Sequence, residues 1–401
     1  MKKKVIVAIV ALLLIAAGAL YFYGKLFSPT PSSLPAGISS EVIERQQEVF
    51  PPADGAAERL DINLPDIAVV AEKLSIPWDI VFLSETDLLV SERTGSIMRL
   101  SLTNEDVRAE IVVPSIGDNV TRGEGGLLGI VKHSDFSTNN WLYIYQTYKD
   151  GGAVTRNRVT RYAFEDDTLG DPLIIIDNIP GAIYHDGGRM AFGPDGLLYI
   201  ATGDATIENL AQQRDSLAGK ILRLRDDGQV PDDNPFGTEV YSLGHRNPQG
   251  LSWDDRGQLW STEHGRSGAS SGMDELNQIE LGKNYGWPLI EGDEAQPGLE
   301  IPKGHSGPYE TWAPASALYW DGSIFFAGLR GQSLYEAKLN DQRTQVLETV
   351  AHFRGEYGRL RSVVLGPDNF FYLTTSNTDG RGQSVSDTDD RIIRINPEVF
   401  R

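Results

Sequence analysis

The 401-residue sequence contains no cysteine, so it can form neither a disulfide nor a thiolate metal site. Basic residues are also scarce, because 36 Lys and Arg stand against 56 Asp and Glu and give a net charge of −20. Nucleic acid and anionic lipid headgroups are bound through basic surface, so this charge argues against both. The six histidines show no helical ligand spacing, which disfavours zinc or iron.

Long hydrophobic runs are absent except for one at the N-terminus, from Val5 to Tyr23, which follows three lysines. Its length is close to that of a helix crossing ~30 Å of hydrocarbon, and the lysines predict a cytoplasmic N-terminus. We expect residues 1–27 to be a retained membrane anchor, or alternatively a signal segment cleaved near Ala17-Gly18-Ala19. Either way the remainder is expected to be extracytoplasmic, membrane-anchored in the first case and secreted or periplasmic in the second. Residues 28–65, rich in Pro, Ser, Gly and charge, predict a tether.

The whole sequence contains 42 Gly and 21 Pro. Residues 66–401 show little helical periodicity, and together with this composition that favours short strands and turns. One pattern recurs six times: an apolar strand, a turn with Asp or Gly, a strand rich in Leu, Tyr or Trp, a loop and a third strand. The six hairpins lie at about residues 77–92, 126–145, 190–200, 250–262, 317–327 and 360–374. This repetition predicts an all-β fold, a six-bladed β-propeller of four-stranded antiparallel sheets.

The third hairpin carries a histidine before its first strand and an aspartate after its second. His185 precedes the strand around Met190, and Asp204 follows the second strand. Because the strands of a hairpin run antiparallel, both residues should emerge at the same end. An imidazole held by a carboxylate suits general-base catalysis, since the carboxylate fixes the tautomer and stabilises the imidazolium. The alternative is a surface histidine with an unrelated turn aspartate.

A polar segment precedes the fourth hairpin at the place that His185 holds in the third. It contains Arg246, Asn247 and Gln249, and this guanidinium with two amides suits carboxylates and carbonyl oxygens. The alternative is a loop held together by Arg246 alone.

Three further arginines are expected at the same mouth of the channel. Arg330 follows the second strand of the fifth hairpin, and Arg359 and Arg361 open the sixth. Their convergence in an acidic chain indicates an anionic ligand with several carboxylates. Alternatively, each arginine pairs with a local aspartate.

A glycine-containing loop with nearby carboxylates follows the second strand of the fourth hairpin. It runs from Glu263 to Gly268 and is followed by Asp274 and Glu275. Backbone carbonyls and carboxylates of this kind are typical of an oxygen-only Ca²⁺ site.

Five separated segments resemble the soluble glucose/sorbosone dehydrogenase family, in the order in which that family has them. They are Gly123 to Gly129, His185 to Asp204, Gly244 to Gly250, Asn284 to Pro288 and Arg359 to Arg361. The resemblance covers about residues 66–396. It implies a six-bladed propeller that uses pyrroloquinoline quinone (PQQ), a tricarboxylated o-quinone, to oxidise aldose sugars.

The resemblance also implies roles for single residues. His185 would be the general base, Asp204 would orient it, and Arg246 would contact the quinone oxygen. The cofactor-binding positions that match the family are Glu124, Arg246, Asn247, Gln249, Arg330, Arg359 and Arg361. Backbone oxygens around Gly265 and Arg266 would hold the cofactor Ca²⁺, and Glu275 and Tyr285 match a second, structural Ca²⁺ site.

Four positions depart from the pattern of the glucose-oxidising members. Glu124 stands where they have Gln, Arg330 where they have Lys, Tyr184 where they have an acidic residue, and Arg266 where they have Pro. These changes bear on substrate identity and cofactor affinity rather than on the fold.

The sequence therefore predicts a PQQ- and Ca²⁺-dependent enzyme that oxidises aldoses to lactones and passes electrons to an external acceptor. One alternative is a Ca²⁺-dependent sugar-lactone hydrolase, whose channel metal would need side-chain carboxylates and not three arginines. Another is a non-catalytic sugar-binding propeller.

Overall fold

A computed structural model describes residues 65–401, apart from residues 104–107, 115–117, 150, 153, 269–270 and 384. The predicted anchor at residues 1–27 lies outside these residues, as does the tether at 28–65 except for its last residue. No helix in the described part is long and apolar enough to cross a membrane.

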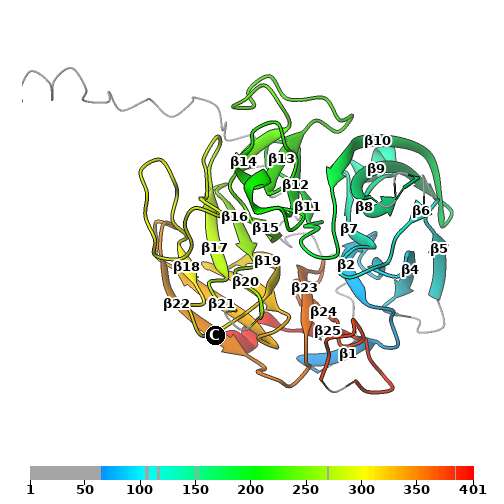
Figure 1. Cartoon of the computed structure of the whole chain (residues 1–401). Coiled ribbons are helices and arrows are strands. Elements are labelled where there is room, and N and C mark those ends of the chain that lie inside the picture. Colours follow the sequence, from blue (N-terminus) through cyan, green and yellow to red (C-terminus); the bar gives the residue numbers. More distant parts are fainter. Residues whose placement is uncertain are drawn as a thin grey trace, which may run out of the picture. The chain divides into compact units, whose positions relative to one another are not determined.

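The strands form six antiparallel sheets that are arranged as the blades of a propeller (Figure 1). Blade 1 consists of β2 (Pro77–Phe82), β3 (Asp87–Glu92), β4 (Ser96–Ser101) and β5 (Arg108–Val112). Blade 2 consists of β6 (Asp118–Asn119), β7 (Leu127–Lys132), β8 (Trp141–Lys149), β9 (Thr155–Glu165) and β10 (Thr168–Pro180). Blade 3 consists of β11 (Met190–Phe192), β12 (Leu198–Thr202), β13 (Lys220–Leu224) and β14 (Val240–Leu243).

The second half of the chain forms the other three blades. Blade 4 consists of β15 (Pro248–Trp253), β16 (Leu259–Glu263), β17 (Glu275–Ile279) and β18 (Gly304–His305). Blade 5 consists of β19 (Pro314–Trp320), β20 (Ser323–Gly328), β21 (Ser333–Leu339) and β22 (Val346–His352). Blade 6 consists of β23 (Leu360–Leu365), β24 (Phe371–Thr375), β25 (Ile392–Ile395) and β1 (Ile67–Ala71). The short helical pieces are α3 (Phe136–Asn139), η1 (Glu208–Gln212) and η3 (Pro397–Phe400). The predicted all-β, six-bladed propeller is confirmed.

Two details go beyond the prediction. Strand β1 pairs with β25, with Ile67 opposite Ile395, so the first described strand completes the last blade and closes the ring. In blade 2, β6 and β7 pair with different parts of the same strand, β8. That blade therefore has five strands but is four strands wide.

The turn of the first hairpin is fixed in the same way in blades 3, 4 and 6. In each, one carboxylate oxygen of an aspartate accepts a hydrogen bond from a turn amide, and the other accepts one from an aromatic side chain on the second strand. The turn aspartates are Asp195, Asp254 and Asp368, and their aromatic donors are Tyr199, Trp260 and Tyr372. This contact explains the recurring combination of turn aspartate and aromatic strand in the sequence.

The core consists of six clusters of buried apolar side chains, one at each interface between neighbouring blades. The cluster between blades 2 and 3, for example, packs Tyr143 and Tyr145 against Met190 and Leu198. Burial of this apolar surface holds the blades together and fixes where their loops project.

The start of each blade's first strand lies beside the end of its second. Pro77 is opposite Glu92 in blade 1, and Pro248 is opposite Glu263 in blade 4. The loops that precede the first strands and those that follow the second strands therefore meet at one end of the propeller, which we call the site end. The turn aspartates lie at the other end.

Candidate functional site

His185 and Asp204 are in direct contact at the site end. The Nδ1 atom of His185 lies 2.7 Å from Oδ1 of Asp204, whose side chain is fully buried while that of His185 is 13% exposed. The contact predicted from the hairpin is thus confirmed. The His185 Nε2 atom has no hydrogen-bond partner among the described residues, so it is free to face a substrate.

Asp204 is held by two further donors. Its Oδ2 accepts a hydrogen bond of 2.9 Å from Trp287 Nε1, and Oδ1 also accepts one of 2.7 Å from the amide of Thr206. Both carboxylate oxygens are therefore engaged. These contacts fix the carboxylate, which in turn keeps the imidazole of His185 in one orientation.

The loop carrying His185 has a left-handed backbone conformation at His185 and packs closely against Gly203. His185 has φ +65°, and its amide donates a 3.0 Å hydrogen bond to Glu124 Oε2. A Cβ atom on Gly203 would lie 1.9 Å from the His185 carbonyl oxygen, so glycine is required there. Two loops of one blade can approach this closely only because Gly203 has no side chain.

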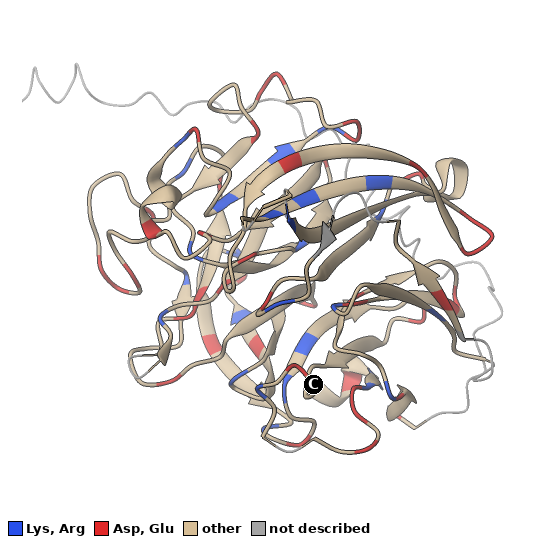
Figure 2. Ribbon diagram, turned by 45° about the vertical axis from the view of Figure 1, so that its right-hand side comes forward, with Lys and Arg blue, Asp and Glu red and all other residues tan. Residues whose placement is uncertain are grey.

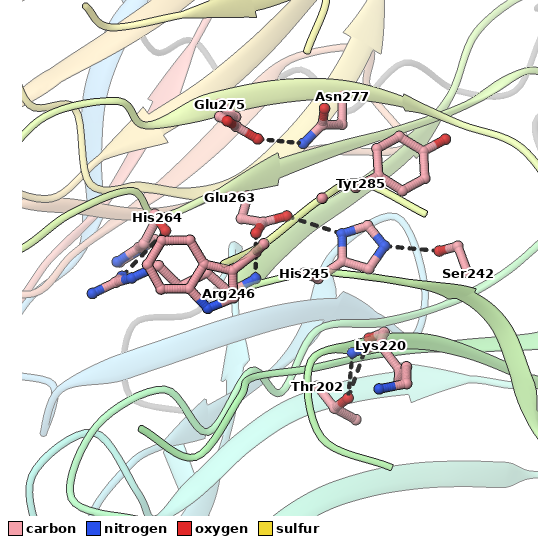
Figure 3. A network of polar contacts seen from close by, with 12 residues as sticks. Thr202, Lys220, Ser242, His245, Arg246, Glu263, His264, Glu275, Asn277 and Tyr285 are labelled. Atoms are coloured by element: carbon pink, nitrogen blue, oxygen red, sulfur yellow. Dashed lines mark hydrogen bonds and ion pairs between the residues drawn. The ribbon is translucent and has the colours of Figure 1, made fainter. Parts of the chain in front are cut away.

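The backbone of Arg246 is held by a buried polar network (Figure 3). His245 Nδ1 lies 2.9 Å from Glu263 Oε2, and the other Glu263 oxygen accepts a hydrogen bond from the Arg246 amide. His245 Nε2 contacts Ser242 Oγ at 2.8 Å, and the imidazole stacks on the ring of Tyr285 with centroids 4.8 Å apart. His245 is completely buried, so this group of side chains positions Arg246 and does not meet a substrate.

The guanidinium of Arg246 reaches the site end. It donates hydrogen bonds of 3.2 Å to the His264 carbonyl oxygen and to Ser267 Oγ, and it lies over the ring of Trp287, 5.3 Å from the centroid. Burial lowers the pKa of Arg246. Its neighbour Asn247 accepts a 3.0 Å hydrogen bond from the Gly187 amide, which joins blade 4 to the loop of His185.

Two of the three predicted arginines lie together in the buried part of the site. Arg359 pairs with Asp379 at 2.7 Å, so the predicted alternative of a local partner holds for this residue. Arg361 donates a 2.8 Å hydrogen bond to Gln249 Oε1, and burial lowers its pKa to about 9. The side chain of Arg330 is exposed, and it has no hydrogen bond or ion pair with the described residues.

Glu124 bridges two loops. One oxygen accepts from the His185 amide, and the other pairs with Arg381 at 3.0 Å. Burial by itself opposes ionisation of Glu124, but the His185 amide and Arg381 favour the charged form, and the pKa of Glu124 is lowered. Glu124 therefore carries a negative charge at neutral pH, and Arg381 offsets it.

Several buried donors at the site end have no hydrogen-bond partner in the described chain. They are Arg93 Nε, Arg189 Nη2, Arg246 Nε, Asn247 Nδ2 and Arg361 Nε. Buried donors are seldom left unpaired, because each costs about 1–3 kcal/mol. Figure 2 shows Lys and Arg residues scattered over the ribbon among Asp and Glu residues. An oxygen-rich anion such as a tricarboxylated quinone fits this donor set.

The loop after β16 is closely packed and lies beside two acidic side chains, Asp274 and Glu275. Its Gly265 amide donates a 2.8 Å hydrogen bond to Asp274 Oδ1, and a Cβ on Gly265 would lie 2.2 Å from the Met273 carbonyl oxygen. Burial, with repulsion from Glu263, raises the pKa of Glu275 to about 8. A cavity here is lined by Arg246, Glu263, His264, Gly265, Met273, Glu275, Tyr285, Trp287, Ile290 and Glu291.

The donors available to a cation there are mostly backbone oxygens. Within the described ranges no three His, Asp or Glu side chains converge to form a metal site. The Tyr285 hydroxyl donates to the Gln278 carbonyl oxygen at 2.7 Å and points away from Glu275 in Figure 3. The side chain of Arg266 pairs with Glu291 at 3.1 Å, and its carbonyl oxygen accepts a 3.4 Å hydrogen bond from the Gly272 amide. Carbonyls and one or two carboxylates are ligands that Ca²⁺ accepts.

Sequence reasoning missed Trp287, Arg93 and Arg381 as residues of this site. Trp287 contacts Asp204 across 83 positions of sequence, and Arg381 contacts Glu124 across 257. A signal did exist for Arg93, which directly follows the second strand of blade 1 as His264 does in blade 4.

Comparison with known proteins identifies the family. A family model described as Glucose / Sorbosone dehydrogenase matches residues 74–386. The aldose sugar dehydrogenase YliI of Escherichia coli K12 is 30% identical over 353 residues, covering 80% of this chain and 92% of that protein. The quinoprotein glucose dehydrogenase B of Acinetobacter calcoaceticus is 32% identical over 258 residues, covering 57% of this chain and 53% of that protein.

A solved structure shows the same likeness. The PQQ-bound form of aldose sugar dehydrogenase from Streptomyces coelicolor superimposes with a TM-score of 0.74 and 38% identity, covering 82% of this chain and 98% of that one. The matched region includes residues of all six blades, so the family recognised from the five segments, and the prediction of an oxidoreductase, are confirmed. The chain belongs to the glucose/sorbosone dehydrogenase family.

Proposed function

We propose that this protein is a PQQ- and Ca²⁺-dependent aldose dehydrogenase that oxidises the anomeric carbon of a sugar to a lactone. One observation carries the proposal: the His185–Asp204 pair opens at the same end as a set of buried donors that lack acceptors. The named activity of the Escherichia coli relative and the PQQ bound to the Streptomyces neighbour support it.

His185 acts as the general base. Its Nε2 takes the proton of the anomeric hydroxyl while the hydrogen on that carbon leaves as hydride. Asp204 stabilises the imidazolium that results, because its carboxylate lies 2.7 Å from Nδ1. PQQ, when bound, would supply the two-electron acceptor for this hydride, and its electrons would go on to an external acceptor.

The remaining predicted residues hold the cofactor. Arg359, Arg361 and the exposed Arg330 offer guanidiniums to its carboxylates, and Arg246 stabilises charge developing on the quinone oxygen. Gln249 positions Arg361 through the 2.8 Å hydrogen bond. Asn247 offers its unpaired Nδ2, and Glu124 holds the loop of the base.

Calcium is proposed at the loop after β16. The carbonyl oxygens of Gly265 and Arg266 would hold the cofactor ion, where it polarises the quinone as a Lewis acid. Glu275, with the carbonyl of Tyr285, would hold the second ion. A cation there would stabilise the ionised form of Glu275, whose pKa is raised by burial and by Glu263.

We also propose an extracytoplasmic location, with the protein anchored by residues 1–27. The support is the apolar run from Val5 to Tyr23 behind three lysines. Signal cleavage would instead release the propeller into the periplasm or medium. N-terminal sequencing of the mature protein separates the two.

The direct test reconstitutes the purified protein with PQQ in the presence and absence of Ca²⁺, and follows reduction of an artificial dye with a panel of aldoses. Dye reduction that requires PQQ and Ca²⁺ is expected. Failure to bind PQQ at micromolar concentration would overturn the proposal. Lactone hydrolysis without PQQ would favour the hydrolase, and sugar binding that survives His185→Ala with no turnover in the wild type would favour a binding protein.

A further inference from the structure

Arg93 is a buried arginine without a partner. Only 8% of the residue is exposed, and its guanidinium makes no hydrogen bond and no ion pair with any described residue. Burial lowers the pKa of Arg93, but arginine stays protonated in proteins. Its charge is therefore buried, and no anionic group of the described residues is in direct contact with it.

Two buried arginines remote from the site pair directly with carboxylates. Arg394 is 4% exposed and pairs with Asp368 at 2.8 Å, and Arg223 is 7% exposed and pairs with Asp195 at 2.9 Å. A buried charge is normally paired, since an unpaired one loses its hydration without compensation. Arg93 departs from this rule at the site end, whereas Arg223 and Arg394 lie with the turn aspartates.

The surroundings of Arg93 carry excess positive charge. Its electrostatic neighbours include Arg359 and Arg381 as well as Asp379 and Glu124. Each of those two carboxylates is already paired, Asp379 with Arg359 and Glu124 with Arg381. The positive charge of Arg93 is therefore not compensated by these carboxylates, and an anionic ligand would neutralise it.

The repeat places Arg93 at the site end. It directly follows β3, and the last residue of that strand, Glu92, lies opposite Pro77 at the start of β2. His264 has the same place after β16, and Asp204 follows β12 by two residues. Arg93 is thus the contribution of blade 1 to a site that the other blades also line.

We propose that Arg93 is a further cofactor-binding residue, whose guanidinium pairs with a carboxylate of bound PQQ. The inference rests on the proposed function. The guanidinium offers a planar set of donors and no acceptor, which matches a carboxylate and neither a sugar hydroxyl network nor a cation.

The test compares wild-type apoprotein with Arg93→Gln, Arg93→Lys and, as a matched control, Arg394→Gln. PQQ binding is measured by titration at two salt concentrations, and thermal unfolding is followed with and without PQQ. We expect Arg93→Gln to weaken PQQ binding by about 10- to 100-fold, the value of a charged hydrogen bond. Arg93→Lys should recover part of this loss, and the salt dependence should be smaller in Arg93→Gln.

The stability of the apoprotein should respond differently to Arg93→Gln and to Arg394→Gln. Arg93→Gln removes an uncompensated charge, so the apoprotein should unfold at the same temperature as wild type or higher, while the upward shift produced by PQQ shrinks. Arg394→Gln should lower the unfolding temperature and leave PQQ affinity within about twofold.

The outcomes separate this inference from the proposed function. Wild-type PQQ binding with unchanged affinity in Arg93→Gln would overturn the role of Arg93 alone. A loss of apoprotein stability in Arg93→Gln equal to that in Arg394→Gln would also overturn it, because Arg93 would then serve the fold. Absence of PQQ binding in the wild type would overturn both.

Discussion

Replacing Asp204 with Asn tests the base and its carboxylate together. Asp204 Oδ1 lies 2.7 Å from His185 Nδ1, and Oδ2 accepts from Trp287 Nε1 at 2.9 Å. An asparagine has only one acceptor oxygen, so its NH₂ must face either the indole N–H or the imidazole. If the NH₂ faces Trp287, two donors oppose each other. If it faces His185, it donates to Nδ1, so the imidazole proton moves to Nε2, which can then no longer accept a proton.

The magnitude follows from the lost charge. A charge-assisted hydrogen bond is worth about 1.5–3 kcal/mol, which corresponds to a fall in kcat of about 10- to 150-fold. Because Asp204 is fully buried and acts through His185, we expect KM for the sugar and the affinity for PQQ to change by less than about threefold. Steady-state kinetics with a saturating dye and a PQQ titration measure the three quantities.

A matched control is available at the other end of the propeller. Asp254 is also buried and also accepts from an indole, Trp260 Nε1, at 2.9 Å, and from two turn amides. Asp254→Asn should cost a similar free energy of unfolding, about 1–3 kcal/mol, without lowering kcat. Equal kcat in Asp204→Asn and wild type, or an equal fall in both variants, would refute the role given to Asp204.

Three further predictions concern buried groups. Burial raises the pKa of Asp186 to about 7. The stability that protonated Asp186 contributes is therefore present below its unfolded pKa near 4 and is lost as the pH rises through 7. Asp186→Asn should make the thermal unfolding temperature less dependent on pH between pH 4 and 8. Glu124→Gln removes a negative charge beside an anionic cofactor and should tighten PQQ binding by up to about tenfold, measured by titration, whereas Glu124→Ala should also lower kcat by releasing the His185 amide. Lys220 Nζ donates to three carbonyl oxygens, so Lys220→Met should lower the free energy of unfolding by at least about 3 kcal/mol in urea, and an unchanged urea midpoint would contradict that.

The hairpins could be predicted because their signals are local. Alternating apolar residues and the turn aspartates lie within about fifteen residues of one another. A fourth strand was predicted for each blade but could not be placed in the sequence, because an edge strand needs little apolar surface: β22 is mostly half-buried or exposed, and β18 has only two residues. Strand β1 could not be assigned to blade 6, since its partner β25 is at the other end of the chain.

In the site, too, contacts within one blade could be predicted and contacts between blades could not. The His185–Asp204 contact followed from one hairpin, because both residues belong to blade 3. Trp287 and Arg381 come from other blades, and only the closed ring brings them beside Asp204 and Glu124. The roles carried over from the family resemblance remain predictions until the cofactor and the variants are measured.

The turn aspartates have a consequence for how the protein can change. Because Asp195, Asp254 and Asp368 tie the hairpins of blades 3, 4 and 6 at the end remote from the site, these three turns do not depend on the chemistry of the opposite loops. Exposed loop residues at the site end, such as Tyr184, can therefore be exchanged in these blades while the strands stay in register. A library directed at new sugars or electron acceptors should vary those loops and keep the three aspartates and their aromatic donors constant.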